Sequence, residues 1–165
     1  MDYLKTLVFF ILMAFAIAWL SNFSETEISG SARAMDGDSL MLDGVEIRLE
    51  GIDAPELSQS CTTAKNSEKT YLCGREARAF LRDLIRGQDV VCTSSEQDKF
   101  DRQLSTCFIG KTNLNAKMVA EGWAVAFGRY QTEENAARGA ARGIWTGGFT
   151  MPQQWRDENN SKSRG

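Results

Sequence analysis

Three short clusters of charged residues carry the groups that could do chemistry. They are Asp36-Gly-Asp38-Ser39, Asp53-Ala54-Pro55-Glu56 and Asp98-Lys99-Phe100-Asp101-Arg102. Each cluster alone also fits a solvated turn, a surface loop or a charged connector. Taken together, carboxylates on separate segments can hold a hard divalent cation, and two arginines can grip a phosphate. A further carboxylate can position or deprotonate a water, so the set is sufficient for phosphodiester hydrolysis.

The composition excludes several other mechanisms. The 165 residues include no His, which rules out Ser/His/Asp and Cys/His catalysis and any His-ligated metal. A calcium-binding EF-hand loop that began at Asp36 would need Glu at position 47, which is Ile. The formal net charge is −3 and stays slightly negative without residues 1–28. This charge counts against tight binding of nucleic acid by electrostatics alone, although an arginine-lined pocket can lie on a nearly neutral domain.

The N-terminal segment has the pattern typical of a targeting sequence. Positions 7–20 form a run of 14 residues without a polar side chain, preceded by Lys5. Such a run is short for a membrane span and typical of the apolar region of a secretory signal. We therefore expect residues 1–27 to be a signal peptide or, through residues 4–23, an N-terminal membrane anchor. The remainder would be exported to a periplasmic or extracellular location.

The cysteines favour the same compartment. The chain has four, Cys61, Cys73, Cys92 and Cys107, and no CxxC pair, so a zinc site or a thioredoxin-like motif fits poorly. Four cysteines allow three pairings. We favour Cys61–Cys73 with Cys92–Cys107, because the second pair falls on two strands that should be neighbours. Disulfides of this kind form in oxidising compartments.

Hydrophobic spacing predicts a domain of short strands and helices. Period-two alternation around the turn at Asp43-Gly44 places Arg48 on the face opposite Ile47 and Leu49. The predicted elements are strands at 39–42, 45–50, 90–93 and 105–109, and helices at 74–86, 113–121 and 133–144. The helix at 133–144 would face inward through Ala137, Ala140, Ala141 and Ile144. The polar residues 156–165 have nothing to bury and are expected to be a disordered tail.

These motifs together resemble one known family. DGDS at 36–39, RLEGIDAPE at 48–56 and DKFDR at 98–102 are similar, in order, to motifs of the thermonuclease, or staphylococcal nuclease-like, family. Leu114-Asn115, Glu121-Gly122 and Arg142-Gly-Ile-Trp145 extend the resemblance, which covers about residues 28–155. It implies an α+β fold: a five-stranded OB-fold barrel with three α-helices, whose concave face binds nucleic acid.

The resemblance also implies roles for individual residues. Asp38, Asp53 and the main-chain carbonyl of Ala54 would bind Ca²⁺, and Glu56 would orient or deprotonate the attacking water. Arg48 and Arg102 would bind the scissile phosphate and stabilise its developing charge. Lys99 and Tyr130 would contact the substrate.

The chain departs from the family pattern at two places. Phe100-Asp101 stands where Tyr-Gly is usual, which puts an extra carboxylate beside Arg102. Gly128 stands where a second base-stacking aromatic residue is usual. The cysteines are also an addition to the cysteine-free archetype, and they would staple an exported domain.

The expected function is that of a Ca²⁺-dependent, largely non-specific nuclease. The resemblance implies a monomer that cuts DNA and RNA, leaves 3′-phosphates and prefers single-stranded or frayed substrates. The alternative is a non-catalytic OB-fold module that binds oligonucleotides or a protein partner at the cell envelope.

Overall fold

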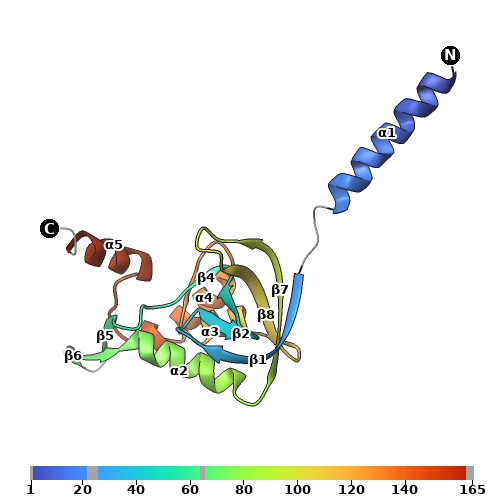
Figure 1. Ribbon diagram of the computed structural model, residues 1–165. Coiled ribbons are helices and arrows are strands. Elements are labelled where there is room, and N and C mark those ends of the chain that lie inside the picture. Colours follow the sequence, from blue (N-terminus) through green and yellow to red (C-terminus); the bar gives the residue numbers. More distant parts are fainter. Residues whose placement is uncertain (1, 22–25, 64–65, 163–165) are drawn as a thin grey trace.

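The computed structural model describes residues 2–21, 26–63 and 66–162, and its centre is a small closed β-barrel (Figure 1). Five strands form the barrel, in the order β3-β2-β1-β7-β8, and a parallel pairing of β3 with β8 closes the ring. Their bounds are Thr26–Ala34 (β1), Ser39–Leu42 (β2), Val45–Leu49 (β3), Asp89–Gln97 (β7) and Gln103–Ile109 (β8), with β9 (Thr112–Asn113) added beside β8. The predicted five-stranded OB-type barrel and α+β class are confirmed.

The β2–β3 hairpin forms where the turn residues predict it. Asp43 and Gly44 both have positive φ angles, 50° and 81°, as a two-residue hairpin turn of this hand requires. Alternation along β3 then buries Ile47 and Leu49 and leaves Arg48 on the opposite face, as predicted.

Three helices cover the barrel. They are α2 (Cys73–Ile85), α3 (Leu114–Ala120) and α4 (Gln131–Gly139). The apolar stripe of α2 packs onto the barrel through Ala77, Leu81 and Ile85. The core joins barrel strands to helices, and its largest buried side chains include Leu40, Leu42, Ile47, Leu49, Leu81, Leu114 and Met118.

The prediction of one long helix over 133–144 is wrong at its C-terminal end. Helix α4 ends at Gly139, and a separate 3₁₀ turn, η1 (Gly143–Thr146), follows. A Cβ on Gly143 would lie 2.2 Å from the carbonyl oxygen of Gly122, to which Ile144 donates a hydrogen bond of 2.9 Å. This close backbone approach requires the chain to leave the helix. Ala137 and Ile144 are buried as expected, whereas Ala140 and Ala141 are exposed.

The prediction of a disordered tail from residue 156 is also corrected. Residues Pro152–Lys162 form helix α5, and residues 163–165 lie outside the described part of the chain. Pro152 occupies the first helical position, where its missing N–H costs nothing. The helix then docks through Arg156 rather than through an apolar stripe.

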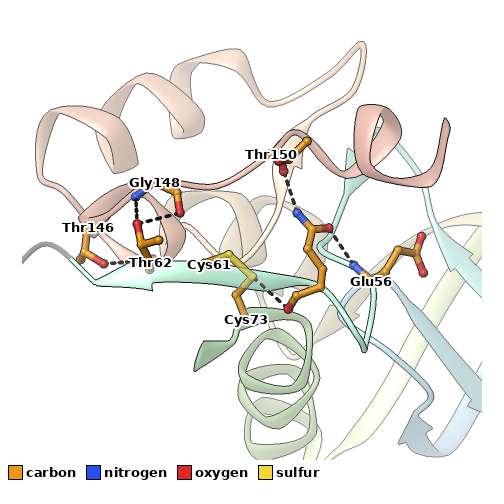
Figure 2. The surroundings of a disulfide bond; sticks show 9 residues. Glu56, Cys61, Thr62, Cys73, Thr146, Gly148 and Thr150 are labelled. Carbon is orange, nitrogen blue, oxygen red and sulfur yellow. Dashed lines mark hydrogen bonds between the residues drawn. A yellow bond between two sulfur atoms is a disulfide. The ribbon is translucent and has the colours of Figure 1, made fainter. Parts of the chain in front are cut away.

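Both predicted disulfides are present. Cys61–Cys73 joins the hairpin of β5 (Ser60–Thr63) and β6 (Asn66–Leu72) to the first residue of α2, beside Glu56 (Figure 2). Cys92–Cys107 joins two directly paired positions of β7 and β8. One bridge therefore fastens the region next to the charged clusters, and the other lies inside the barrel.

The N-terminal apolar segment forms helix α1 (Asp2–Ser21), which lies apart from the barrel (Figure 1). In the described ranges, none of the helices combines the length and the apolar character needed to cross a bilayer. The expected signal peptide or anchor at residues 1–27 stays a prediction, and positions 1 and 22–25 of it lie outside the described residues.

Candidate functional site

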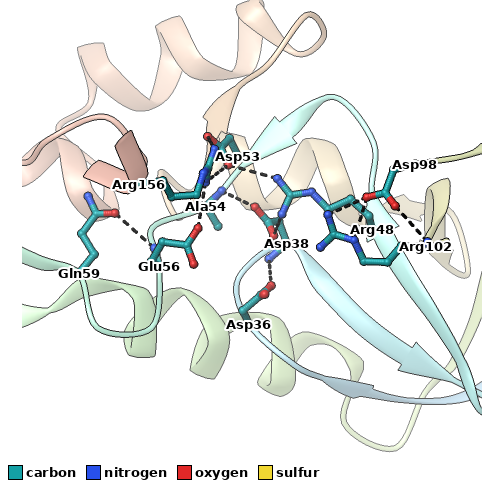
Figure 3. Close-up of polar contacts among 10 residues, drawn as sticks. All are labelled: Asp36, Asp38, Arg48, Asp53, Ala54, Glu56, Gln59, Asp98, Arg102 and Arg156. Carbon is teal, nitrogen blue, oxygen red and sulfur yellow. Dashed lines mark hydrogen bonds and ion pairs between the residues drawn. The ribbon is translucent and has the colours of Figure 1, made fainter. Parts of the chain in front are cut away.

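The three charged clusters of the sequence meet at one place on the barrel (Figure 3). Asp38 directly precedes β2, Arg48 lies in β3, and Arg102 directly precedes β8. The parallel register of β3 and β8 pairs Arg48 with Leu104, which brings the two arginine-bearing segments side by side. Asp53 ends the short strand β4 (Ile52–Asp53), which pairs with β10 (Val125–Ala126).

Arg48 bridges Asp38 and Asp53, the two aspartates that the family resemblance implies as Ca²⁺ ligands. Its Nη1 donates to Oδ1 of Asp38, and its Nη2 donates to Oδ1 of Asp53 at 3.2 Å. Burial lowers the pKa of Arg48, but the charges of Asp38 and Asp53 outweigh that effect and raise it. The guanidinium is therefore held firmly charged between the two carboxylates.

Asp38 is a buried carboxylate that a positive charge stabilises. Its side chain is almost fully buried, and Oδ2 accepts a hydrogen bond of 2.6 Å from the N–H of Ala54. Burial raises the pKa of Asp38 well above its usual value, against the attraction of Arg48. Burial also acts to raise the pKa of Asp36, but hydrogen bonds from the Asp38 N–H and from Ser39 outweigh it and lower the pKa.

The donors at this place suit a hard cation. Asp38 and Asp53 offer buried carboxylate oxygens, and Ala54, which is also buried, offers a main-chain carbonyl. Among the described residues, no group of three or more His, Cys, Asp or Glu side chains could hold a metal ion. A cation here would rest on these two carboxylates, with main-chain, water or substrate oxygens completing its shell.

Glu56 combines a fixed backbone with an accessible carboxylate. Its N–H donates to Oε1 of the buried Gln59 at 3.3 Å, and Nε2 of Gln59 donates to the carbonyl of Thr150 at 2.6 Å. Gly74 lies so close that a Cβ there would be 1.9 Å from the Glu56 carbonyl oxygen. The side chain of Glu56 is 36% exposed. The carboxylate can thus reach a water while its main chain stays in place.

Arg102 is positioned by Asp98. Oδ2 of Asp98 accepts from Nε and Nη2 of Arg102 at 2.9 and 2.7 Å, and Oδ1 accepts from the N–H groups of Phe100 and Arg102. Burial acts to raise the pKa of Asp98, but the hydrogen bonds from Arg102 and the two N–H groups lower it. Asp101 is exposed and has a φ of 63°.

Four of the residues expected to act in catalysis or substrate binding line one hollow of about 630 Å³. They are Arg48, Glu56, Lys99 and Arg102, and the hollow is also lined by Asp36, Asp98, Phe100, Phe127 and Arg156. Tyr130 is not among its lining residues. It precedes α4, and the guanidinium of Arg129 lies 5.6 Å from the centre of its ring.

Phe127 is a residue that sequence reasoning missed. Its side chain is 60% exposed, and it lines both the hollow above and an adjoining one of about 350 Å³ that reaches Gly128 and Arg129. An exposed aromatic ring therefore stands directly beside Gly128, the position where the second aromatic residue was expected.

Arg156 is the second residue that sequence reasoning missed. Both of its terminal nitrogens bind Asp53, Nη1 to Oδ1 and Nη2 to Oδ2, each at 2.9 Å. Nη1 also donates to Oε1 of Glu56 at 3.0 Å. These contacts, the bond to Asp53 first, raise the pKa of Arg156. The helical signal of Pro152 followed by polar helix-forming residues could have indicated α5, but nothing local indicated its partners.

The chain is similar in sequence to several known proteins. Residues 46–147 match the model of the staphylococcal nuclease homologue family. An "Uncharacterized endonuclease" of Haemophilus influenzae is 31% identical over 135 residues, which cover 73% of this chain and 68% of that protein. The "Micrococcal nuclease" of Shigella flexneri is 31% identical over 146 residues, covering 75% and 77%. "Succinoglycan biosynthesis protein ExoI" of Rhizobium meliloti is 29% identical over 126 residues, covering 72% and 64%.

Proposed function

Because the chain belongs to the staphylococcal nuclease-like family and is a nuclease by that membership, we propose that it is Ca²⁺-dependent and largely non-specific. It would hydrolyse phosphodiester bonds of DNA and RNA and leave 3′-phosphates. One observation carries the proposal: Glu56, Arg48 and Arg102 line one hollow of about 630 Å³, and Arg48 joins this hollow to a pair of buried aspartates, Asp38 and Asp53.

The chain's own residues would divide the work as follows. Glu56, held by its backbone, would orient a water or accept its proton at a carboxylate oxygen. Arg48 and Arg102 would bind the scissile phosphate and stabilise the charge that develops on its oxygens. Asp98 would keep Arg102 aimed at the hollow through its paired hydrogen bonds.

Asp38, Asp53 and the carbonyl of Ala54 would hold Ca²⁺. The bound ion would supply positive charge next to the phosphate and the attacking oxygen. Support comes from the burial of both carboxylates, because a buried negative charge is stabilised by a positive partner.

The substrate would be single-stranded or locally opened nucleic acid. Lys99 and the arginines of the hollow supply contacts to the backbone, and the exposed ring of Phe127 offers a platform on which a base can stack. Tyr130 would contribute from the edge of this region. The enzyme would act as a monomer.

The globular part would act outside the cytoplasm, delivered by residues 1–27 as a signal peptide or membrane anchor. Two disulfides support this location, because such bonds persist in oxidising compartments. The exposed apolar side chains along Tyr3–Phe15 of α1 also support it, since an exposed helix of this kind is poorly suited to water.

The decisive experiment compares digestion of denatured DNA and of RNA by the purified, oxidised chain in Ca²⁺ and in a chelator. We expect degradation when Ca²⁺ is present and none in the chelator. Turnover should fall at least about a hundredfold in Glu56→Gln or Arg48→Ala, the effect typical of losing one preorganised charge. Glu46→Gln is the matched control, because it makes the same change at an exposed position of β3.

Three outcomes separate the possibilities. Near-normal rates in Glu56→Gln would remove Glu56 from the mechanism. Cleavage that persists in the chelator would contradict the metal requirement. A folded chain that binds oligonucleotides but cleaves none in any divalent cation would establish the binding-module alternative.

A further inference from the structure

Helix α5 brings a positive charge onto the groups that would do the chemistry. Arg156 engages both carboxylate oxygens of Asp53 at 2.9 Å and one carboxylate oxygen of Glu56 at 3.0 Å (Figure 3). Asp53 also accepts from Arg48, so two guanidinium groups share its carboxylate. With α5 docked, a metal ligand and the water-activating acid are both occupied.

A docked Arg156 and a bound divalent cation exclude each other on electrostatic grounds. Both carry positive charge and both would sit against the same Asp53 oxygens, where the side chain of Asp53 is 97% buried and screening by water is weak. Asp38 and Asp36 lie in the same cluster, and their charges favour a doubly charged ion over a single guanidinium. The cation can therefore displace Arg156. The free energy required for this displacement is the free energy with which α5 docks on the barrel.

The docking energy of α5 is small. Most of its described side chains are exposed, while Pro152 is buried and Trp155 is half-buried. The chain entering the helix is fastened by the hydrogen bond from Gln59 to Thr150. Beyond this, the ion pairs of Arg156, whose own side chain is 34% exposed, hold the helix against the barrel. Pairing with the buried Asp53 strips water from the guanidinium, and this desolvation offsets much of the Coulombic attraction, so the docked and undocked states lie close in energy.

On this geometry we propose that α5 is an autoinhibitory latch, and that Arg156 competes with the divalent cation for Asp53 and holds Glu56 inactive until the cation binds. The inference rests on the proposed metal site at Asp38 and Asp53. It adds that the C-terminal helix sets the metal concentration at which the enzyme switches on.

The test measures Ca²⁺ binding directly, by calorimetric titration of the full oxidised chain and its variants. If the latch is closed in about nine molecules of ten, its removal lowers the apparent Kd about tenfold. We expect that shift for Arg156→Gln and a smaller one for Arg156→Lys, which keeps the charge but loses the paired geometry. Arg82→Gln, which removes a similarly charged side chain paired with the adjacent Asp83 on α2, should leave the Kd unchanged.

A second measurement follows α5 itself in the unaltered chain. Because coupling between sites is reciprocal, Ca²⁺ should release the helix and accelerate hydrogen exchange of the amides in 153–162. The amides of α3 serve as the internal reference. In Arg156→Gln, exchange in α5 should be fast with or without Ca²⁺.

The outcomes distinguish this inference from the function on which it rests. Equal Kd values for the wild type and Arg156→Gln, with unchanged exchange in α5 and normal Ca²⁺-dependent cleavage, would overturn the latch alone. Absence of Ca²⁺ binding in every variant would overturn the metal site and the latch together.

Discussion

At the scale of single residues, Asp101 stands out because its backbone is left-handed. Its φ of 63° is unfavourable for most side chains, although aspartate and asparagine tolerate it better than others. The family pattern has glycine at this point, and the structure supplies the conformational reason. The carboxylate does not hold Arg102, which is bound by Asp98 instead.

We expect Asp101→Gly to stabilise the protein by about 0.5–1 kcal/mol, because glycine adopts this conformation freely. It should also bind a single-stranded oligonucleotide a few-fold more tightly, since a negative charge beside the phosphate site is lost. Asp101→Asn removes the charge but keeps the conformational cost, so it should improve binding alone. Urea unfolding and oligonucleotide titration measure the two effects; equal stability of both variants would contradict the strain.

The position of a site residue was predictable from the sequence where that residue lies in a regular strand or in the same short motif as another site residue. The position of Arg48 followed from alternation along one strand, and Asp53 and Glu56 lie within four consecutive residues. Arg156 could not be assigned in this way, because its partners Asp53 and Glu56 lie about a hundred positions earlier in the chain. Phe127 was missed for a related reason, since only the folded hollow shows that its ring is exposed.

At the scale of elements, the connection between β7 and β8 is organised by one carboxylate. Asp98 accepts hydrogen bonds from two N–H groups of its own loop and from the side chain of Arg102. Its lowered pKa means that the folded state binds the proton more weakly than the unfolded state. The stabilisation is therefore fully present above the unfolded pKa and is lost as the pH falls through the folded value.

The lowered pKa of Asp98 predicts how the stability of Asp98→Asn depends on pH. The variant should unfold more easily than the wild type at neutral pH, and the difference should remain constant down to about pH 5. It should then shrink below about pH 4, the ordinary range of an aspartate. Urea unfolding of both proteins between neutral and acidic pH measures it. A difference that grows on acidification would show that Asp98 is not stabilised in its charged form.

The elements themselves were predictable to different degrees. The strand pair 39–42 and 45–50 was nearly correct because its turn residues and its alternation agree. Strand β7 extends to Gln97, beyond the predicted 90–93, because its polar second half is paired with β8 although it lacks the apolar alternation that predicts a strand. Helix α4 was overextended because local propensity does not register the contact of Gly122 with Gly143.

At the scale of the whole molecule, two covalent links brace a small domain. Cys61–Cys73 spans a sequence separation of 12, and Cys92–Cys107 one of 15. Loops of this size correspond to about 3 kcal/mol of stabilisation each in the chain-entropy model. The first link also fastens the start of α2, whose Gly74 packs against the main chain of Glu56.

We therefore expect Cys61→Ala with Cys73→Ala, and Cys92→Ala with Cys107→Ala, each to lose about 3 kcal/mol of unfolding free energy. The first double variant should also lose activity under conditions in which it stays folded, while the second should keep it. Thiol alkylation of the protein taken from its native compartment should find no free cysteine. Finding all four thiols reduced there would contradict the proposed export.

The parallel pairing of β3 with β8 also governs how the molecule folds. Thr26 pairs with Ser94, and Ile47 pairs with Gln103, so the ring joins positions that are distant along the chain. Contacts of this kind must form against a large loss of chain entropy, which slows folding compared with helical proteins of equal size. While the chain grows from its N-terminus, β1, β2 and β3 can form a meander. The outer edge of β1 stays open until Asp89–Gln97 emerges, and the outer edge of β3 stays open until Gln103–Ile109 emerges. Barrel closure is therefore a late event, and the growing chain exposes unpaired strand edges throughout the interval before it.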